Sequence, residues 1–442
     1  MLNKDRSRQV LEISLPIVGG MVSQNVLNLV DAAMVGTQGS AAIAAIGISG
    51  FINFMAVAFF TGFAAGVQAM VSRRIGQGRS EEAAYPMNAA LAIITLLALP
   101  TSIALFFLAP KILHLLNDDP ELLKEGIPYL QARFVGIVAV GLNFSFRSYW
   151  SAISQTQYYL RTLLIMHTIN IILNYALIFG HFGMPELGTL GAGIGTTVSV
   201  ALGTLYYHYL ASKHTKQYGY LAQLARWPTI RSILKISIPS ALQQLFFAGG
   251  FTALFWIIGM VGTHQLAAVN AITNVMLVGI LPCIALGIGA ATLVGQSLGR
   301  KDPQNAYLWG WDVAKMAIVF AIGLGTIFYL FTDPIMGIFL KEPEALKLAH
   351  WPFKLSALII VIDAVGLVFL NALNGAGSTK STLYVSIISQ WILFLPVAWY
   401  LGPYLGKSLT IIWVAYSVYR VLQTGAFVWL WQRRSWSRIQ FD

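Results

Sequence analysis

The chain has 442 residues, of which 57% are hydrophobic and only 10% are charged, and its formal net charge is +11. Because soluble domains usually carry about a quarter charged residues, this composition all but excludes a water-soluble globule and indicates a polytopic membrane protein. The Lys and Arg residues stand in short clusters between long apolar runs and form no continuous basic face, so we expect no nucleic-acid partner.

Hydropathy predicts an all-α integral membrane protein with twelve transmembrane helices. A β-barrel would need strands of alternating polarity, and uninterrupted apolar runs such as residues 89–110 lack that alternation. In chain order, the predicted helices lie at about residues 10–35, 41–70, 86–110, 127–152, 159–181, 188–212, 231–259, 265–295, 308–332, 349–373, 379–402 and 409–432.

The basic residues predict how these helices are oriented. If the N-terminus is cytoplasmic, most Lys and Arg residues fall on the cytoplasmic side, including the pairs at 73–74 and 300–301. The positive-inside rule then puts both termini in the cytoplasm. We therefore expect a multi-pass protein of the cytoplasmic (inner) membrane, in contact with membrane lipids.

An internal repeat divides the chain in two. The segment LEISLP at 11–16 recurs as LKISIP at 234–239, and residues 71–83 recur in modified form at 294–306, both at an offset of 223 residues. An even number of helices per repeat gives parallel repeats, so we expect two pseudo-symmetric lobes of six helices each. The expected organisation is an N-terminal lobe over 1–212, a cytoplasmic linker over 213–229 and a C-terminal lobe over 230–442.

Two acidic residues stand inside predicted helices. Asp31 lies near the outer end of the first helix, and Asp363 lies well inside the tenth. A charged side chain at bilayer depth costs about 2.5–3.5 kcal/mol on insertion scales, so both carboxylates should face the protein interior or a water-filled cavity. On the first helix Gln24, Asn28 and Asp31 are spaced by four and then three, which aligns them on one face.

The fifth helix repeats this pattern. His167, Asn170 and Asn174 have spacings of three and four, and this second polar stripe is a candidate to meet the first across a shared pocket. A buried carboxylate there suits coupling, because it can take up H+, or Na+ with amide oxygens of Asn170 or Asn174 completing the shell beside Asp31. The alternative is that the amides only hydrogen-bond between helices as packing contacts.

Further residues carry weaker signals. Pro16 and Pro239 occupy equivalent places in the repeat, and first-turn placement is the favoured interpretation, with a functional bend as the alternative. Gln243 and Gln244 are polar in an apolar stretch, and either could face a central cleft. Arg420 on the twelfth helix is assigned a structural role. The residues expected to contact substrate are Gln24, Asn28, Asp31, His167, Gln243, Gln244 and Asp363.

Enzymatic chemistry has no support in the sequence. There is one cysteine, and no nucleophile elbow, Walker loop or zinc motif occurs. We therefore expect a protein that is not an enzyme and needs no cofactor besides H+ or Na+ as a coupling ion.

The segments LVDAAMVG (29–36), NIILNYALIFGHFGMPELGTLGAGIGTTVS (170–199) and IDAVGLVFLNALNGAGSTKSTL (362–383), together with the six-plus-six repeat, resemble the multidrug and toxic compound extrusion (MATE) transporters. The closest resemblance is to the NorM-like branch, with partial DinF-like features. It implies cation-coupled antiport of amphipathic, often cationic, drugs through a cleft between two lobes. By position, Asp31 resembles the coupling acid of the first helix, Asn170 and Asn174 the polar pair of the fifth, Asp363 the acid of the tenth, and Pro16 the conformational proline of the first.

The chain also departs from the family pattern. The glutamate of the seventh helix in NorM-like proteins is replaced by Phe247 or Ala248, and the aspartate often found in the fifth helix of the DinF-like branch is replaced by Asn174. Coupling through Asp31, with Asp363 secondary, is therefore the simplest expectation, while the ion and its stoichiometry stay open. The protein is expected to be a monomer. The alternative function is a lipid-linked oligosaccharide or lipid flippase of the same superfamily.

Overall fold

The computed structural model describes residues 4–223 and 226–441. Within these ranges the secondary structure is helical and contains no strand, which confirms the all-α prediction. Eleven helical spans in these ranges are long and apolar enough to cross a membrane, and some of them, such as Ser40–Gly76, join two of the helices named below. A bent pair formed by α5 (Pro120–Val135) and α6 (Ile137–Ala152) raises the number to twelve. Residues 1–3, 224–225 and 442 belong to the expected lobes and linker but lie outside the ranges that the structure describes.

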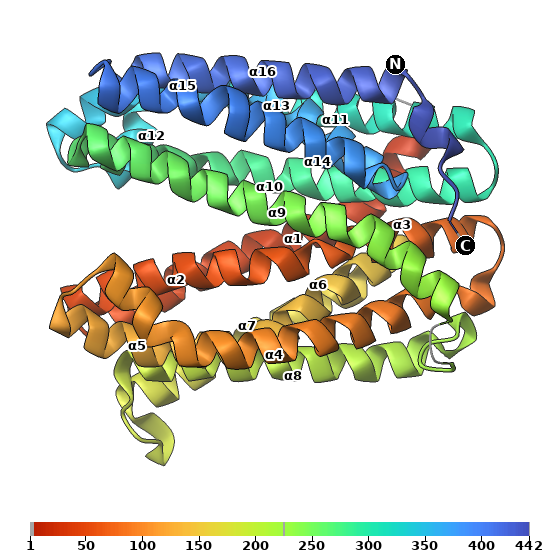
Figure 1. Cartoon of the computed structure of the whole chain (residues 1–442), viewed down its shortest axis with the longest axis horizontal. Coiled ribbons are helices and arrows are strands. Elements are labelled where there is room, and N and C mark those ends of the chain that lie inside the picture. The colour runs from red at the N-terminus through yellow and green to blue at the C-terminus, as the bar shows by residue number, and fades with distance from the viewer. Residues whose placement is uncertain (1–3, 224–225, 442) are drawn as a thin grey trace. The chain divides into compact units, whose positions relative to one another are not determined.

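The first half of the chain contains α1 to α8 (Figure 1). Besides α5 and α6, the helices are α1 (Lys4–Gly36), α2 (Ser40–Thr61), α3 (Phe63–Gly76), α4 (Tyr85–Leu116), α7 (Gln157–Phe179) and α8 (Gly188–His214), with short 3-10 turns at Ser80–Glu82, His181–Gly183 and Lys216–Tyr218.

The second half contains α9 to α16. These helices are α9 (Trp227–Val261), α10 (Thr263–Gly299), α11 (Pro303–Leu330), α12 (Thr332–Phe339), α13 (Pro343–Gly375), α14 (Thr379–Ile387), α15 (Leu395–Trp399) and α16 (Leu409–Gln432). Two π-helical segments, η4 (Ile388–Phe394) and η5 (Tyr400–Tyr404), join α14 and α15 into one span, and a 3-10 turn follows at Ser435–Arg438.

Breaks inside the predicted helices fall at glycines or beside prolines. The predicted helix 127–152 bends by 48° at Gly136, between α5 and α6. The predicted helix 41–70 is interrupted at Gly62, where a Cβ would overlap the backbone of Ala241 in α9. The π-helical segments contain or precede Pro396 and Pro403, each of which lacks the N–H that a regular α-helix requires.

The first-turn interpretation of Pro16 and Pro239 is wrong. The first α-helix begins at Lys4 and the ninth at Trp227, so both prolines lie well inside their helices. The charged segment that precedes the apolar run continues the first helix toward the N-terminus, which moves Pro16 away from its start. Each proline removes one backbone hydrogen bond from the helix that contains it.

The contacts divide the chain into two compact units, which we call the C-terminal unit and the N-terminal unit. The C-terminal unit comprises Met1–Leu15, Gly76–Gly78 and Leu242–Phe441, and the N-terminal unit comprises Pro16–Ile75 and Arg79–Ala241. The helices α1 and α9 therefore each contribute residues to both units, and the change falls next to Pro16 in one and near Pro239 in the other. The lobe boundaries inferred from the repeat remain a prediction.

In the N-terminal unit, α7 packs closely against α8 because α8 presents small residues to it. A Cβ at Gly191 would meet the carbonyl oxygen of Leu177, and one at Gly195 would overlap the side chain of Asn174. Small residues at such positions let two membrane helices approach to backbone distance. This close approach holds the polar residues of α7 next to those of α8.

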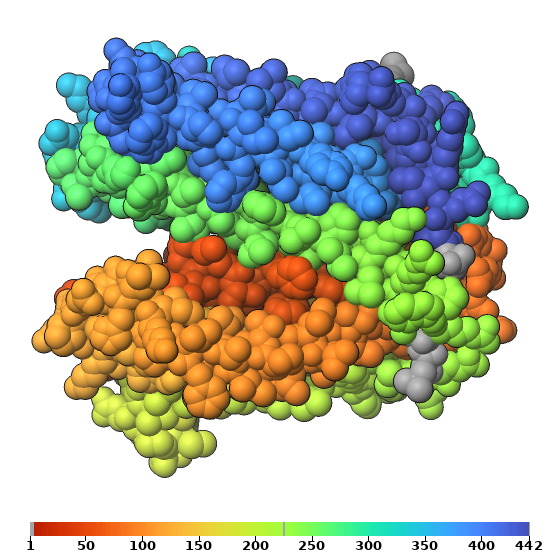
Figure 2. Space-filling view, viewed as in Figure 1, coloured from red at the N-terminus to blue at the C-terminus, as the bar shows by residue number. Residues whose placement is uncertain are grey.

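In the C-terminal unit, α13 packs against α10, α11 and α16. Nearby, the Trp391 Nε1 of η4 donates to the Phe246 carbonyl of α9 at 3.0 Å, and Figure 2 shows α9 side by side with the segment that contains η4. The start of α1 is anchored on α11. Arg6 Nε lies 2.6 Å from the Asp312 carboxylate, and the guanidinium lies 3.6 Å from the centre of the Trp309 ring.

Candidate functional site

The polar residues of α1 and α7 come together in the N-terminal unit. Asn174 Nδ2 donates to Asp31 Oδ1 at 2.8 Å and lies 3.2 Å from Asn170 Oδ1. Asn170 Nδ2 in turn donates to Thr196 Oγ1 at 3.1 Å and to Ser199 Oγ at 3.3 Å, both on α8. The three helices therefore form one hydrogen-bonded polar cluster around Asp31.

The surroundings of Asp31 are polar but not strongly charged. Asn170 and Asn174 are fully buried, while Asp31 is partly exposed. Among the described residues, the Asp31 carboxylate takes part in no ion pair, although Arg133 of α5 acts on it electrostatically from farther away. A neutral amide is thus its direct hydrogen-bond donor.

The side-chain oxygen of Asn174 accepts no hydrogen bond from any described residue. Its Oδ1 is buried, and no donor in the described ranges reaches it. An unsatisfied buried acceptor costs about 1–3 kcal/mol, so the observed orientation requires compensation, which the charge-assisted bond from Nδ2 to Asp31 supplies. This oxygen is therefore a buried acceptor of the cluster that has no donor in the described part of the chain.

A second polar group lies farther along the same two helices. Ser23 Oγ lies 2.7 Å from His167 Nδ1, and His167 Nε2 lies 3.1 Å from Gln24 Oε1. Because the Gln24 amide nitrogen donates to Asn28 Oδ1 at 3.2 Å, its oxygen faces the imidazole and His167 Nε2 is the donor. In a neutral ring His167 Nδ1 then accepts from the Ser23 hydroxyl.

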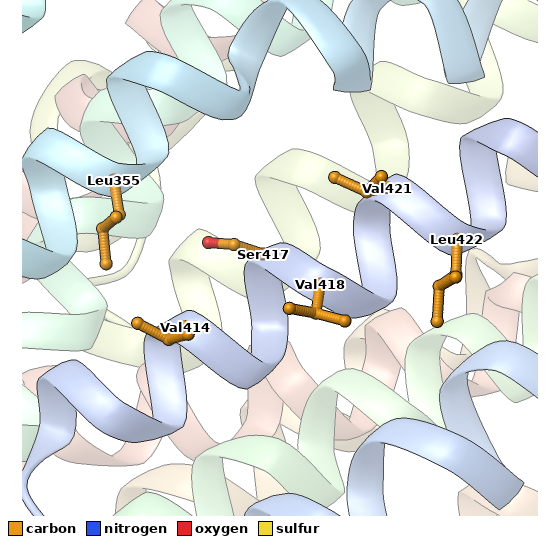
Figure 3. Close-up of a pocket in the computed structure, with 6 residues that line it drawn as sticks. All are labelled: Leu355, Val414, Ser417, Val418, Val421 and Leu422. Atoms are coloured by element: carbon orange, nitrogen blue, oxygen red, sulfur yellow. The ribbon is translucent and has the colours of Figure 1, made fainter.

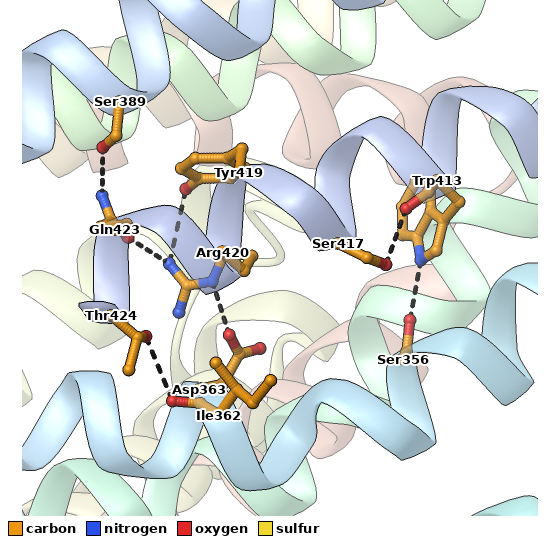
Figure 4. A network of polar contacts seen from close by, with 10 residues as sticks. All are labelled: Ser356, Ile362, Asp363, Ser389, Trp413, Ser417, Tyr419, Arg420, Gln423 and Thr424. Carbon is orange, nitrogen blue, oxygen red and sulfur yellow. Dashed lines mark hydrogen bonds and ion pairs between the residues drawn. The ribbon is translucent and has the colours of Figure 1, made fainter. Parts of the chain in front are cut away.

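Asp363 lies in the C-terminal unit in a different environment. Its Oδ1 accepts from Arg420 Nε at 2.6 Å, and the side chains are 5% and 14% exposed, respectively (Figure 4). Arg420 Nη1 donates to Gln423 Oε1 at 2.7 Å, and Gln423 Nε2 donates to Ser389 Oγ at 2.8 Å in η4. Asp363 is therefore one half of a buried ion pair.

The two glutamines of α9 point in different directions. Gln243 is buried, with its Nε2 2.8 Å from Ser386 Oγ, and its Oε1 accepts from Thr382 Oγ1 at 3.4 Å. Gln244 is exposed. Gln243 thus holds α9 against α14, and Gln244 is the one of the two whose side chain is exposed.

Sequence reasoning missed the residues that complete these clusters. Thr196 and Ser199 have a spacing of three on α8, the same signal that singled out the stripes of α1 and α7, but Thr and Ser are common in membrane helices. The partner of Asp363 was visible as Arg420, a basic residue inside a predicted helix. Only the fold shows that these two charges meet.

The remaining features do not add a charged site. A hollow of about 230 Å³ on α13 and α16 is lined by Leu355, Val414, Ser417, Val418, Val421 and Leu422 (Figure 3). Its lining is almost wholly apolar. No group of three or more His, Cys, Asp or Glu in the described part of the chain is arranged to hold a metal ion.

Long apolar helices with buried polar clusters define a multi-pass membrane protein, and comparison with known proteins gives its family. The MatE family model matches residues 16–176 and 239–400, which is most of the chain. The chain therefore belongs to the MatE family, whose members are transporters.

Individual relatives agree with this assignment. The chain is 27% identical over 409 residues to a "Probable multidrug resistance protein NorM" of Mannheimia succiniciproducens, covering 90% of this chain and 87% of the relative. It is 25% identical over 417 residues to a protein of the same description from Thermotoga maritima, covering 92% and 88%. Both relatives match along almost their entire length.

Solved structures show the same fold. A MOP superfamily transporter from Pyrococcus furiosus superimposes with a TM-score of 0.89 at 18% identity, covering 99% of this chain and 98% of the other. A mutant of the Vibrio cholerae MATE transporter VcmN superimposes with a TM-score of 0.89 at 18% identity, covering 97% of both chains. The predicted fold class is thereby confirmed.

Proposed function

We propose that this chain is a cation-coupled antiporter that exports amphipathic, often cationic, drugs and other foreign compounds, with Asp31 as the coupling carboxylate. The relatives described as multidrug resistance proteins support the substrate class. The observation that best supports the role of Asp31 is its hydrogen bond from the neutral amide of Asn174 in a buried polar cluster. A carboxylate without an ion-pair partner is free to exchange a cation.

The Asn174 amide gives this exchange a physical mechanism. While Asp31 is ionised, it accepts from Asn174 Nδ2, and Asn174 Oδ1 stays without a donor. When H+ or Na+ reaches Asp31, the amide rotates and offers Oδ1 to the new hydroxyl or to the metal ion. Asn170 Oδ1, which now accepts from Asn174, is a further oxygen for Na+.

This change links ion binding to helix packing. The rotated amide gives up the bond that Nδ2 donates to Asp31, which links α1 and α7, and accepts a new bond through Oδ1. Because Asp31 and Asn174 lie on different helices, the occupancy of Asp31 alters the packing of α1 on α7 and shifts the balance between inward-open and outward-open states. Substrate binds the polar groups of α1 and α7, among them Gln24, Asn28 and His167, while Pro16 allows α1 to bend.

The protein works as a monomer in the cytoplasmic membrane, surrounded by lipid and with both termini in the cytoplasm. This orientation follows from the excess of Lys and Arg in the loops on that side.

Efflux from proteoliposomes tests the proposal. A fluorescent cationic dye is loaded into vesicles, and Na+ and pH gradients are imposed separately. We expect one of the gradients to drive dye transport in the wild type, and Asp31→Asn to reduce transport to the level of protein-free vesicles while the protein stays folded. Asp118→Asn, a matched change at a side chain that is 94% exposed, should transport normally. Wild-type rates in the Asp31 variant would remove this residue from the mechanism.

A further inference from the structure

The two acidic residues of the membrane helices are compensated in different ways. Asp31 accepts a hydrogen bond from an amide and has no ion-pair partner among the described residues. Asp363 lies 2.6 Å from the guanidinium of Arg420, and the residue is only 3% exposed. The charge of Asp363 is therefore neutralised from within the protein.

The position of Arg420 is itself fixed by neighbours. Its Nη1 donates to Gln423 Oε1 at 2.7 Å and to the Tyr419 hydroxyl at 3.4 Å. Gln423 Nε2 donates in turn to Ser389 Oγ, in the π-helical segment η4 of the neighbouring span. The guanidinium is thus held against Asp363 by groups on two elements (Figure 4).

A guanidinium keeps its proton under all ordinary conditions, so it is a permanent positive charge. A proton or Na+ that approached Asp363 would have to displace this charge or share the carboxylate with it, in surroundings of low dielectric constant where like charges repel strongly. The other groups that act on the pair electrostatically are Cys283, Tyr416 and Tyr419, and none of them is a second carboxylate or a second basic side chain.

We propose that Arg420 is the resident counter-cation of Asp363, so that the C-terminal unit binds no coupling ion and each transport cycle is coupled through Asp31 alone. The inference rests on the proposed function, because it assigns the coupling step to one of the two acids. Arg420 thus acts as a positioning residue whose guanidinium holds the Asp363 carboxylate.

Ion binding tests this without transport. In an Asp31→Asn background, Na+ should leave the midpoint of thermal unfolding in detergent unchanged, because neither acid is free. Adding Arg420→Gln should create a Na+-dependent rise of that midpoint, and adding Asp363→Asn as well should abolish it. A Na+-dependent rise in the Asp31→Asn protein that disappears with Asp363→Asn would overturn the proposal, even if the Arg420 variants fail to fold.

Transport measurements provide a second test. We expect Asp363→Asn and Arg420→Gln each to reduce the initial efflux rate about tenfold or more, because each leaves one buried charge without its partner. The double variant removes both charges and should recover a rate close to wild type, with the same ratio of ions to dye. A folded but inactive double variant would overturn the proposal, whereas an uncoupled wild type would instead refute the proposed function.

Discussion

Gly195→Ala tests whether the close approach of α8 to α7 positions the coupling site. An added Cβ would overlap Asn174 Oδ1 and lie 3.3 Å from both its Cγ and its backbone nitrogen. Asn174 has no room to retreat, because it is fully buried and its amide nitrogen is bonded to Asp31 and Asn170. Either the two helices separate or the Asn174 side chain leaves Asp31.

The magnitude follows from these two responses. Overpacking costs about 1–3 kcal/mol, and the loss of a hydrogen bond to a charged group costs about 1.5–3 kcal/mol. The free energy of unfolding should therefore fall by about 2.5–6 kcal/mol if both occur. Ion-driven dye efflux should fall with it, because the donor to Asp31 is displaced.

The assay combines thermal unfolding in detergent with efflux from proteoliposomes. Gly323→Ala is the matched control, because Gly323 also lies inside a membrane helix and a Cβ there meets nothing within 4 Å. The pair Gly195→Ala with Asn174→Ala should regain the part of the stability that the overlap costs, but not the hydrogen bond to Asp31 and not coupling. A Gly195→Ala protein with wild-type stability and efflux would refute the reasoning.

Three further changes are informative. Asn174→Asp places a second carboxylate beside Asp31, and two adjacent carboxylates do not both stay ionised readily. More H+ or Na+ should therefore move per dye molecule, as measured by the ion gradient that just stops efflux. An unchanged ratio of ions to dye would count against a shared site. His167→Ala removes the imidazole that bonds Ser23 and Gln24 of α1. The concentration of dye at half-maximal transport should rise about fivefold for each of these positioning hydrogen bonds lost, with the ion ratio unchanged; an altered ion ratio would place His167 in coupling instead. Arg6→Gln should lower the free energy of unfolding by about 1–2 kcal/mol. The reversed pair Arg6→Asp with Asp312→Arg should restore that free energy in the same thermal assay. No loss in the single variant would show that the contact of Arg6 with Asp312 is not needed for stability.

The sequence predicted those features that depend on periodicity within one helix. Spacings of three and four placed Asp31 on one face of α1 and Asn174 on one face of α7, and the structure brings these two side chains into contact. Whether they couple ions remains a prediction. The long apolar runs likewise predicted the membrane helices, because burial in lipid requires nearly continuous hydrophobicity.

Features that depend on contacts between distant segments were not predicted. Asp363 and Arg420 are 57 residues apart, and nothing in either helix alone indicates that they form an ion pair. The break at Gly62 depends on the backbone of α9. The first helix starts at Lys4 rather than near residue 10, and its first turns carry Arg6, whose partner Asp312 lies on the distant α11.

The division of α1 and α9 between the two units has a consequence for producing the protein in parts. A polypeptide ending after α8 would carry residues 4–15, including Arg6, without the α11 side chains on which they pack. A polypeptide starting at α9 would likewise begin with a segment whose packing neighbours, such as Gly62, belong to the missing fragment. Neither piece is a self-sufficient folding module, so we expect each to be degraded when synthesised alone and to survive only when both are made in the same cell.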